Sequence, residues 1–221
     1  MQMIIVANWK LNLTFKEVKS WVATFNNFAA GYAFNKVVPV VCPSFIYISY
    51  LKENLAGARI GSQNISQFTN GAYTGEVSAE QLKDFAEYSI IGHSERRSHF
   101  SETDEIVAKK AGICLNNKII PIICISKIEQ IALLKDLSNI LVAFEPLEAI
   151  GSKIPDNPQH IENMAREIIQ YVPNAKVLYG GSVSEENVKS FSELENISGF
   201  LIGNESLNPT SFINIIKKCD M

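Results

Sequence analysis

The sequence predicts an α/β fold, a single-domain (β/α)₈ barrel that spans residues 1–221. Short runs rich in Val and Ile alternate eight times with longer, helix-like segments, which is typical of a parallel sheet. No Gly-x-Gly-x-x-Gly follows the first run, so an open sheet that binds a dinucleotide lacks its main support. Eight units within this length fit a closed barrel better than an open, doubly wound sheet.

The eight short runs are nearly continuous in apolarity, as expected of strands that are buried on both faces. They span residues 3–8, 37–42, 58–63, 88–93, 119–125, 139–145, 176–181 and 198–203. Pro39 and Pro121 lie inside two of these runs, where each removes a hydrogen-bond donor. We therefore expect both prolines near strand beginnings or at irregular points.

The longer segments have the spacing of amphipathic helices. In residues 14–31, apolar side chains recur every three or four positions and form one stripe. Thr14 with Glu17, and Ser78 with Gln81, are spaced as capping boxes. Further helices are expected over residues 78–86, 102–117, 157–172, 184–194 and 209–219, with a short one over 126–137.

Composition excludes several classes of function. The formal net charge of −3 argues against a nucleic-acid or anionic-membrane partner, which favours a basic excess. No apolar run approaches the 18 or so residues that span a bilayer, and the first residues lack the features of a signal peptide. The four cysteines form no Cys-x-x-Cys pair, so we expect reduced structural thiols and a cytoplasmic protein.

The active site of such a barrel lies at the carboxyl ends of its strands. Lys10 follows the first strand, His93 ends the fourth and Glu145 ends the sixth. Glycine-containing turns follow the seventh and eighth strands, where backbone N–H groups commonly bind a phosphate. The sequence therefore predicts a lysine, a histidine and a carboxylate at one mouth, beside a phosphate site.

Motifs spread over nearly the whole chain resemble the triosephosphate isomerase family, in family order and at strand ends. They occupy residues 7–12, 61–64, 71–82, 91–97, 102–105, 143–152, 179–187 and 199–207. The resemblance implies an isomerase that interconverts dihydroxyacetone phosphate and D-glyceraldehyde 3-phosphate by proton transfer through an enediolate. It implies no cofactor and no metal, and it places the enzyme in glycolysis and gluconeogenesis.

The same resemblance implies a role for each site residue. Glu145 corresponds to the base, His93 to the electrophile that polarises the substrate oxygens, and Lys10 to the cation that stabilises the enediolate. A following helix N-terminus would disfavour the imidazolium form of His93. The remaining correspondences are Asn8 as a polar neighbour and, for the phosphate, Gly151, Ser182, Gly203 and Asn204.

Surrounding residues are expected to support this site. Glu95 is read as an ion-pair partner of Lys10 or of an arginine, and Arg96 and Arg97 as structural charge partners at a subunit interface. Residues 146–152, directly after the base, form the candidate lid. The resemblance also implies a homodimer through the loop that contains Thr74.

Four features depart from the family pattern. Glu148 stands in the lid hinge where the family has a tryptophan, and Ser126-Lys127 replaces a Gly-Glu pair. The stretch between Cys124 and Glu145 is short, which shortens the fifth helix. Asn204 and Glu205 follow Gly203, where the family usually has a second glycine. An acid this close to a phosphate dianion should weaken binding unless its side chain points away.

Two alternative functions stay open, and the first follows from these departures. One is a barrel whose catalysis has decayed and which binds a phosphate ligand. The other is a different sugar-phosphate isomerase on the same scaffold, since a fold does not dictate a function.

Overall fold

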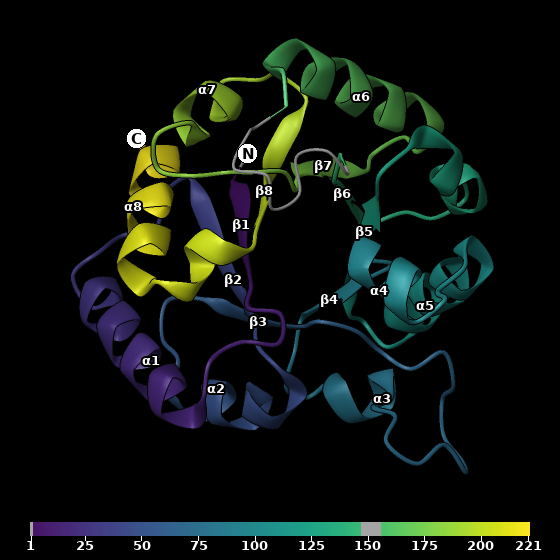
Figure 1. The fold of residues 1–221 in the computed structure, drawn as a ribbon, viewed down its shortest axis with the longest axis horizontal. Helices are drawn as coiled ribbons and strands as arrows, with labels where there is room; N and C mark the ends of the chain where they lie inside the picture. The colour runs from purple at the N-terminus through teal and green to yellow at the C-terminus, as the bar shows by residue number, and fades with distance from the viewer. Residues whose placement is uncertain (1, 147–155) are drawn as a thin grey trace.

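The computed structural model describes residues 2–146 and 156–221, and its centre is a closed barrel of eight parallel strands (Figure 1). The strands are β1 (Met3–Asn8), β2 (Val37–Cys42), β3 (Arg59–Ser62), β4 (Tyr88–Ile91), β5 (Ile120–Ile125), β6 (Leu141–Phe144), β7 (Lys176–Tyr179) and β8 (Ile197–Ile202). Each strand pairs with the next along the chain, and β8 pairs with β1. The predicted barrel is confirmed.

Helices form a ring around the barrel (Figure 1). They are α1 (Phe15–Ala29), α2 (Ile48–Asn54), α3 (Ala79–Leu82), α4 (Ser94–His99), α5 (Asp104–Asn116), α6 (Pro158–Tyr171), α7 (Val188–Ser192) and α8 (Pro209–Asp220). Three short 3-10 helices are η1 (Phe45–Tyr47), η2 (Ile128–Leu134) and η3 (Asn204–Leu207). In the described ranges, no helix is long and apolar enough to cross a bilayer.

The helix predictions were right in most places and incomplete in two. The Glu17 carboxylate accepts a hydrogen bond from Thr14 N at 2.7 Å, and Gln81 N donates to Ser78 Oγ, as the capping boxes predicted. The helix expected over residues 126–137 is the 3-10 helix η2. The sequence did not predict α2 and α4, which have only seven and six residues and carry no long apolar stripe.

Buried side chains form two layers. One lies inside the barrel, where Val6, Val40 and Leu178 meet, and the other lies between the barrel and the helices. Alternate residues of a strand point to opposite faces, so every strand contributes to both layers. Pro39 and Pro121 lie within the first three residues of β2 and β5, as expected.

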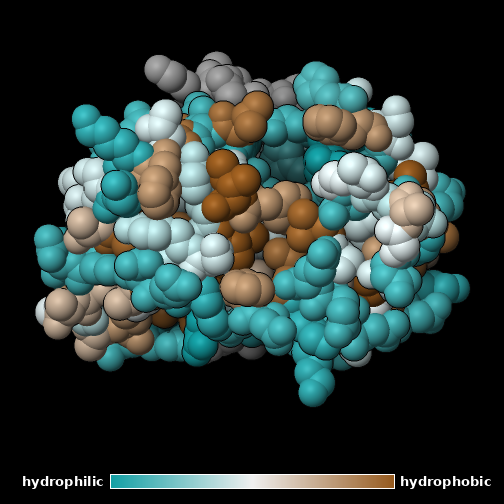
Figure 2. Space-filling view, turned by 90° about the horizontal axis from the view of Figure 1, so that it is seen from below, coloured by the Kyte–Doolittle hydropathy of each residue, from teal (hydrophilic) through white to brown (hydrophobic). Residues whose placement is uncertain are grey.

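One side of the molecule exposes apolar side chains. Figure 2 views the side that carries α1, α2 and α3, and hydrophobic residues gather in the middle of this face. Leu11 is 97% exposed and Ile46 is 76% exposed, and the Phe15 ring stacks on Tyr47 with centroids 6.0 Å apart. Leu11 and Ile46 follow the neighbouring strands β1 and β2. We call Leu11, Phe15, Phe45 and Ile46 the apolar face.

The barrel closes between β8 and β1, where the two backbones come very close. Gly199 of β8 pairs with Ile4 of β1, next to a register shift between β7 and β8. Its φ of +154° is one that residues with side chains rarely adopt. A Cβ at this position would lie 2.0 Å from Ile4 O and 2.7 Å from Ile4 N. Because both contacts are with backbone atoms, only a glycine fits the closing pair.

Gly199→Ala should therefore destabilise the whole barrel. We expect the free energy of unfolding to fall by at least about 3 kcal/mol, through backbone strain and displacement of β1. Chemical denaturation followed by circular dichroism measures this change.

Gly112→Ala is the matched control, because a Cβ at Gly112 would have no atom within 4 Å and the residue lies inside α5. We expect this change to raise stability by up to about 1 kcal/mol, since alanine favours helix. Equal stabilities of Gly199→Ala and the unchanged protein would contradict the closure argument.

Candidate active site

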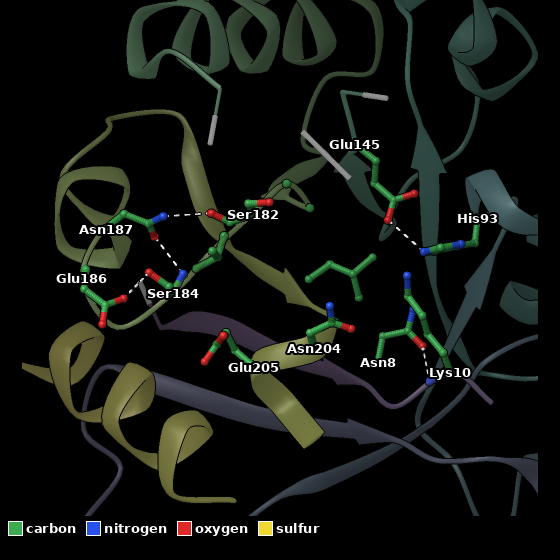
Figure 3. A pocket seen from close by; sticks show the side chains of 15 residues that line it. Asn8, Lys10, His93, Glu145, Ser182, Ser184, Glu186, Asn187, Asn204 and Glu205 are labelled. Atoms are coloured by element: carbon green, nitrogen blue, oxygen red, sulfur yellow. Dashed lines mark hydrogen bonds and ion pairs between the residues drawn. The ribbon is translucent and has the colours of Figure 1, made fainter. Parts of the chain in front are cut away.

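A cavity of about 390 Å³ opens at the carboxyl ends of the strands (Figure 3). It is lined by Asn8, Lys10, His93, Glu145, Ser182, Gly203 and Asn204, together with residues of the turns after β7 and β8. The structure thus brings together all the predicted site residues that it describes. Gly151 and the rest of residues 147–155, which include most of the predicted lid, lie outside the described residues.

Glu145 and His93 contact each other at the wall of this cavity. Glu145 follows β6 and His93 follows β4, and Glu145 Oε1 lies 3.1 Å from His93 Nε2 (Figure 3). Both are nearly buried, with 3% of Glu145 and 5% of His93 exposed. Among the residues that the structure describes, Glu145 Oε2 has no hydrogen-bond partner. One carboxylate oxygen is therefore anchored by His93, and the other is buried without a hydrogen bond.

The protonation of His93 follows from its two contacts. His93 is the N-cap of α4, and its Nδ1 accepts a hydrogen bond from Glu95 N at 3.3 Å. The neutral ring therefore carries its proton on Nε2, which faces Glu145.

The charge balance at His93 differs from the sequence prediction. Burial lowers the pKa of His93, but the Glu145 carboxylate and the Glu95 charge outweigh it, so the pKa is raised. The prediction considered only the helix N-terminus after His93, which disfavours the imidazolium. In this arrangement the nearby Glu145 and Glu95 carboxylates favour the imidazolium.

Lys10 is held at the mouth by its neighbours. Its φ of 52° is left-handed, and its backbone N–H donates to Asn8 Oδ1 at 3.2 Å. Gln63 Nε2 donates to the Lys10 carbonyl at 2.9 Å. Lys10 Nζ forms an ion pair with Glu95 at 2.6 Å, as the sequence predicted for Glu95. These contacts hold the only lysine or arginine among the described residues that line the cavity.

Glycines make room beside Glu145 and beside Lys10. A Cβ at Gly180 would lie 2.7 Å from Glu145 Cγ, so a side chain there would displace the carboxylate. A Cβ at Gly203 would lie 3.9 Å from Lys10 Nζ, which places the turn after β8 beside the lysine. The turn after β7 is ordered by Asn187, whose Oδ1 accepts from Ser184 N and whose Nδ2 donates to Ser182 O.

Cys124 lies against the Glu145 carboxylate, a contact that the sequence did not indicate. Cys124 is fully buried in β5. Burial and the Glu145 charge raise the pKa of the Cys124 thiol, so it is a neutral S–H beside the carboxylate. All four cysteines are buried and free, which agrees with the prediction of structural thiols.

A buried ion cluster holds Gly92, the residue directly before His93. Glu102 accepts hydrogen bonds from Arg96 Nε at 2.6 Å, from Lys110 Nζ and from the backbone N–H of Gly92 at 3.3 Å. Burial raises the pKa of the Glu102 carboxyl, but these cations outweigh it and lower the pKa.

The two arginines after His93 are charge partners within the chain. Arg97 pairs with Asp104 at 2.6 Å, and Arg96 pairs with Glu102. The structural role predicted for both arginines is thus confirmed, and their place at a subunit interface stays a prediction. In residues 2–146 and 156–221, no group of three or more His, Cys, Asp and Glu side chains could hold a metal ion.

Comparisons with known proteins agree over nearly the whole chain. The sequence model of the triosephosphate isomerase family matches residues 3–219. A triosephosphate isomerase of Mesomycoplasma hyorhinis is 36% identical, with 96% of this chain and 97% of that protein covered. Those of Buchnera aphidicola and Aquifex aeolicus are 35% and 33% identical, with 96% and 98% of this chain and 95% and 99% of theirs covered.

Replacing Glu145 should change the titration of His93. Glu145→Gln removes the carboxylate that raises the pKa of His93, so we expect this pKa to fall while burial continues to lower it. An NMR titration of the imidazole resonances measures the change, with His99 and His160 as internal controls. A His93 pKa that stays the same or rises would show that Glu145 is not the main partner of the ring.

Proposed function

The chain belongs to the triosephosphate isomerase family and is an isomerase of dihydroxyacetone phosphate and D-glyceraldehyde 3-phosphate, and we propose that Glu145 is the base of this reaction. The carrying observation is the buried Glu145 carboxylate, which lines the cavity and whose Oε2 has no hydrogen-bond partner among the described residues. A buried carboxylate oxygen without a partner is ready to accept a proton from a bound substrate.

The proton next to a carbonyl is weakly acidic, so the base needs help from fixed donors. In our proposal Glu145 takes a proton from one carbon of the substrate and returns it to the neighbouring carbon. His93 Nε2–H donates to the substrate oxygens and moves a proton between them. To bind the substrate, His93 Nε2–H must break its contact with the Glu145 carboxylate. His93 then loses the interaction that raises its pKa. The neutral ring is the form that this proposal uses.

Lys10 is proposed to meet the negative charge of the enediolate. Its ammonium group lies at the mouth, held by Glu95 at 2.6 Å. Asn8 supports it by accepting the Lys10 backbone N–H, and its own side chain is 5% exposed at the cavity. A cation that is fixed before the reaction stabilises developing charge without reorganisation.

The phosphate is proposed to bind at the turns after β7 and β8. Backbone N–H groups of Ser182, Gly203 and Asn204 are the proposed donors, since all three residues line the cavity. Gly151 is a further proposed donor that lies outside the described residues, as do residues 147–152 of the predicted lid.

A second copy of this chain is the proposed partner. The residues of the apolar face come after β1 and β2 in the chain. On the same side of the molecule, the segment between β3 and α3 extends beyond the ring of helices (Figures 1 and 2). That segment contains Thr74 and is exposed from Gly71 to Glu76. Burying apolar side chains that are as exposed as Leu11 and Ile46 would favour association. We propose that the Thr74 segment of each copy packs on the apolar face of the other.

The proposed setting is glycolysis and gluconeogenesis in the cytoplasm. Four buried, free thiols support a reducing compartment, because an oxidising one favours disulfides. Fractionation of the source cells with an antibody against this chain would test the location.

Removing or moving the Glu145 carboxylate should slow isomerisation. We expect Glu145→Gln to lower kcat by at least about 100-fold, because the base is lost. Glu145→Asp draws the carboxylate back by one methylene, and a shift of about 1 Å can cost about 100-fold. Coupled assays in both directions measure the rates, with Glu195→Gln as the control at an exposed glutamate before β8. Rates within about threefold of the unchanged protein would remove Glu145 from its proposed role.

Charges on either side of the proposed interface should dissociate the dimer. We expect Ile46→Glu and Thr74→Arg to shift the protein from dimer to monomer in sedimentation experiments, with activity falling in parallel. Leu133→Glu is the matched control, because Leu133 of η2 is 51% exposed and lies outside the apolar face. A wild-type monomer that is fully active at high dilution would contradict the proposal.

A further inference from the structure

The charges around the cavity are unusual for a site that binds a phosphate dianion. Among the described lining residues, Lys10 is the only lysine or arginine, and Glu145, Glu186 and Glu205 are carboxylates. Glu95, which lies just outside the lining, already pairs with Lys10. The carboxylates therefore outnumber the cation that faces the ligand.

Two of these carboxylates lie near the proposed phosphate end. Figure 3 shows Glu186 and Glu205 on the side of the cavity away from Lys10 and His93. Glu205 follows directly on Asn204, one of the proposed phosphate donors, and consecutive Cα atoms are about 3.8 Å apart. The first turn of η3 is fixed by Ser206, whose N–H and Oγ both bond to Gly203 O, at 2.9 and 2.6 Å. Glu205 is thus held beside the phosphate turn by its backbone.

Glu205 differs from Glu186 in its contacts. Ser184 Oγ donates to the Glu186 carboxylate at 2.5 Å, and this bond lowers the pKa of Glu186. In the part of the chain that the structure describes, the Glu205 carboxylate takes part in no ion pair or hydrogen bond, and the residue is partly exposed. Its charge therefore acts on whatever anion enters the cavity.

We propose that Glu205 is a specificity-determining residue that weakens the binding of phosphate dianions to this site. The inference rests on the proposed place of the phosphate at Ser182, Gly203 and Asn204. The repulsion is electrostatic and depends on the ligand's charge, so it acts on phosphorylated substrate, phosphorylated product and inorganic phosphate alike. Its effect is to favour release of these anions over their accumulation in the site.

Repulsion of this kind should change KM rather than kcat. The substrate's phosphate keeps its charge while a proton moves between the carbons, so the repulsion between Glu205 and the phosphate is the same in the bound substrate and in the transition state. An interaction that is uniform in this sense changes KM and leaves kcat largely unaffected. A residue that only supported the fold would change kcat and stability as well.

Glu205→Gln tests this with little change in shape. We expect KM for glyceraldehyde 3-phosphate, and the inhibition constant of inorganic phosphate, to fall about tenfold at low salt. The difference should shrink at 0.5 M salt, because the Debye length is then only about 4 Å. Glyceraldehyde, which lacks the phosphate, should react at the same rate in both proteins. Glu195→Gln is the matched control, since it removes one exposed negative charge at the other end of β8.

Three results would overturn the proposal. Unchanged constants in Glu205→Gln would show that this charge does not reach the phosphate. An equal effect of Glu195→Gln would show that only net charge matters. A fall in kcat at constant KM would give Glu205 another role.

Calorimetric titration with inorganic phosphate separates this proposal from the assigned activity. It measures anion affinity in the unchanged protein and in Glu205→Gln without any turnover. A tighter Glu205→Gln complex supports the role of Glu205 even if no isomerisation is detected, and the missing isomerisation would count against the assigned activity alone.

Discussion

The buried Glu102 carboxylate is the contact on which the geometry of the mouth depends. It accepts hydrogen bonds from the side chains of Arg96 in α4 and Lys110 in α5, and from the backbone N–H of Gly92, directly after β4. Lys110 also donates to Asn64, which follows β3. A buried charge set of this kind is stable only when every member has partners, because an uncompensated charge is very costly in the interior. The cluster therefore fixes the turn on which the next residue, His93, stands.

From this turn a chain of contacts leads to the substrate cavity. Glu95 N binds His93 Nδ1, which directs the other ring nitrogen toward Glu145, and the Glu95 carboxylate holds Lys10. Base, acid and cation come from three different strands, yet each is positioned by groups that are themselves held. Such preorganisation lets fixed donors meet a developing charge without rearrangement. The space for Glu145 is completed by Gly180, where a side chain would displace it.

Most of the fold and the site follow from the sequence, and the differences have physical reasons. Each strand is a dense apolar run, and Lys10, His93 and Glu145 lie at strand ends, so barrel geometry alone brings them together. Short polar helices such as α4 carry no stripe and were missed. Two facts depend on distances that no sequence pattern states. Cys124 meets Glu145 through the register of β5 against β6, and the raised pKa of His93 depends on a 3.1 Å contact with Glu145.

The pairing of Gly199 with Ile4 also bears on how the chain is made. The two residues are 195 positions apart (199 − 4). One edge of β1 pairs with β2, and the other stays unpaired until β8 has been made. At about 5 to 20 residues per second, translation of that interval takes about 10 to 40 s. During this time the nascent chain presents an open β edge, which is a template for aggregation. The closing contact between Gly199 and Ile4 thus also ends the exposure of this edge.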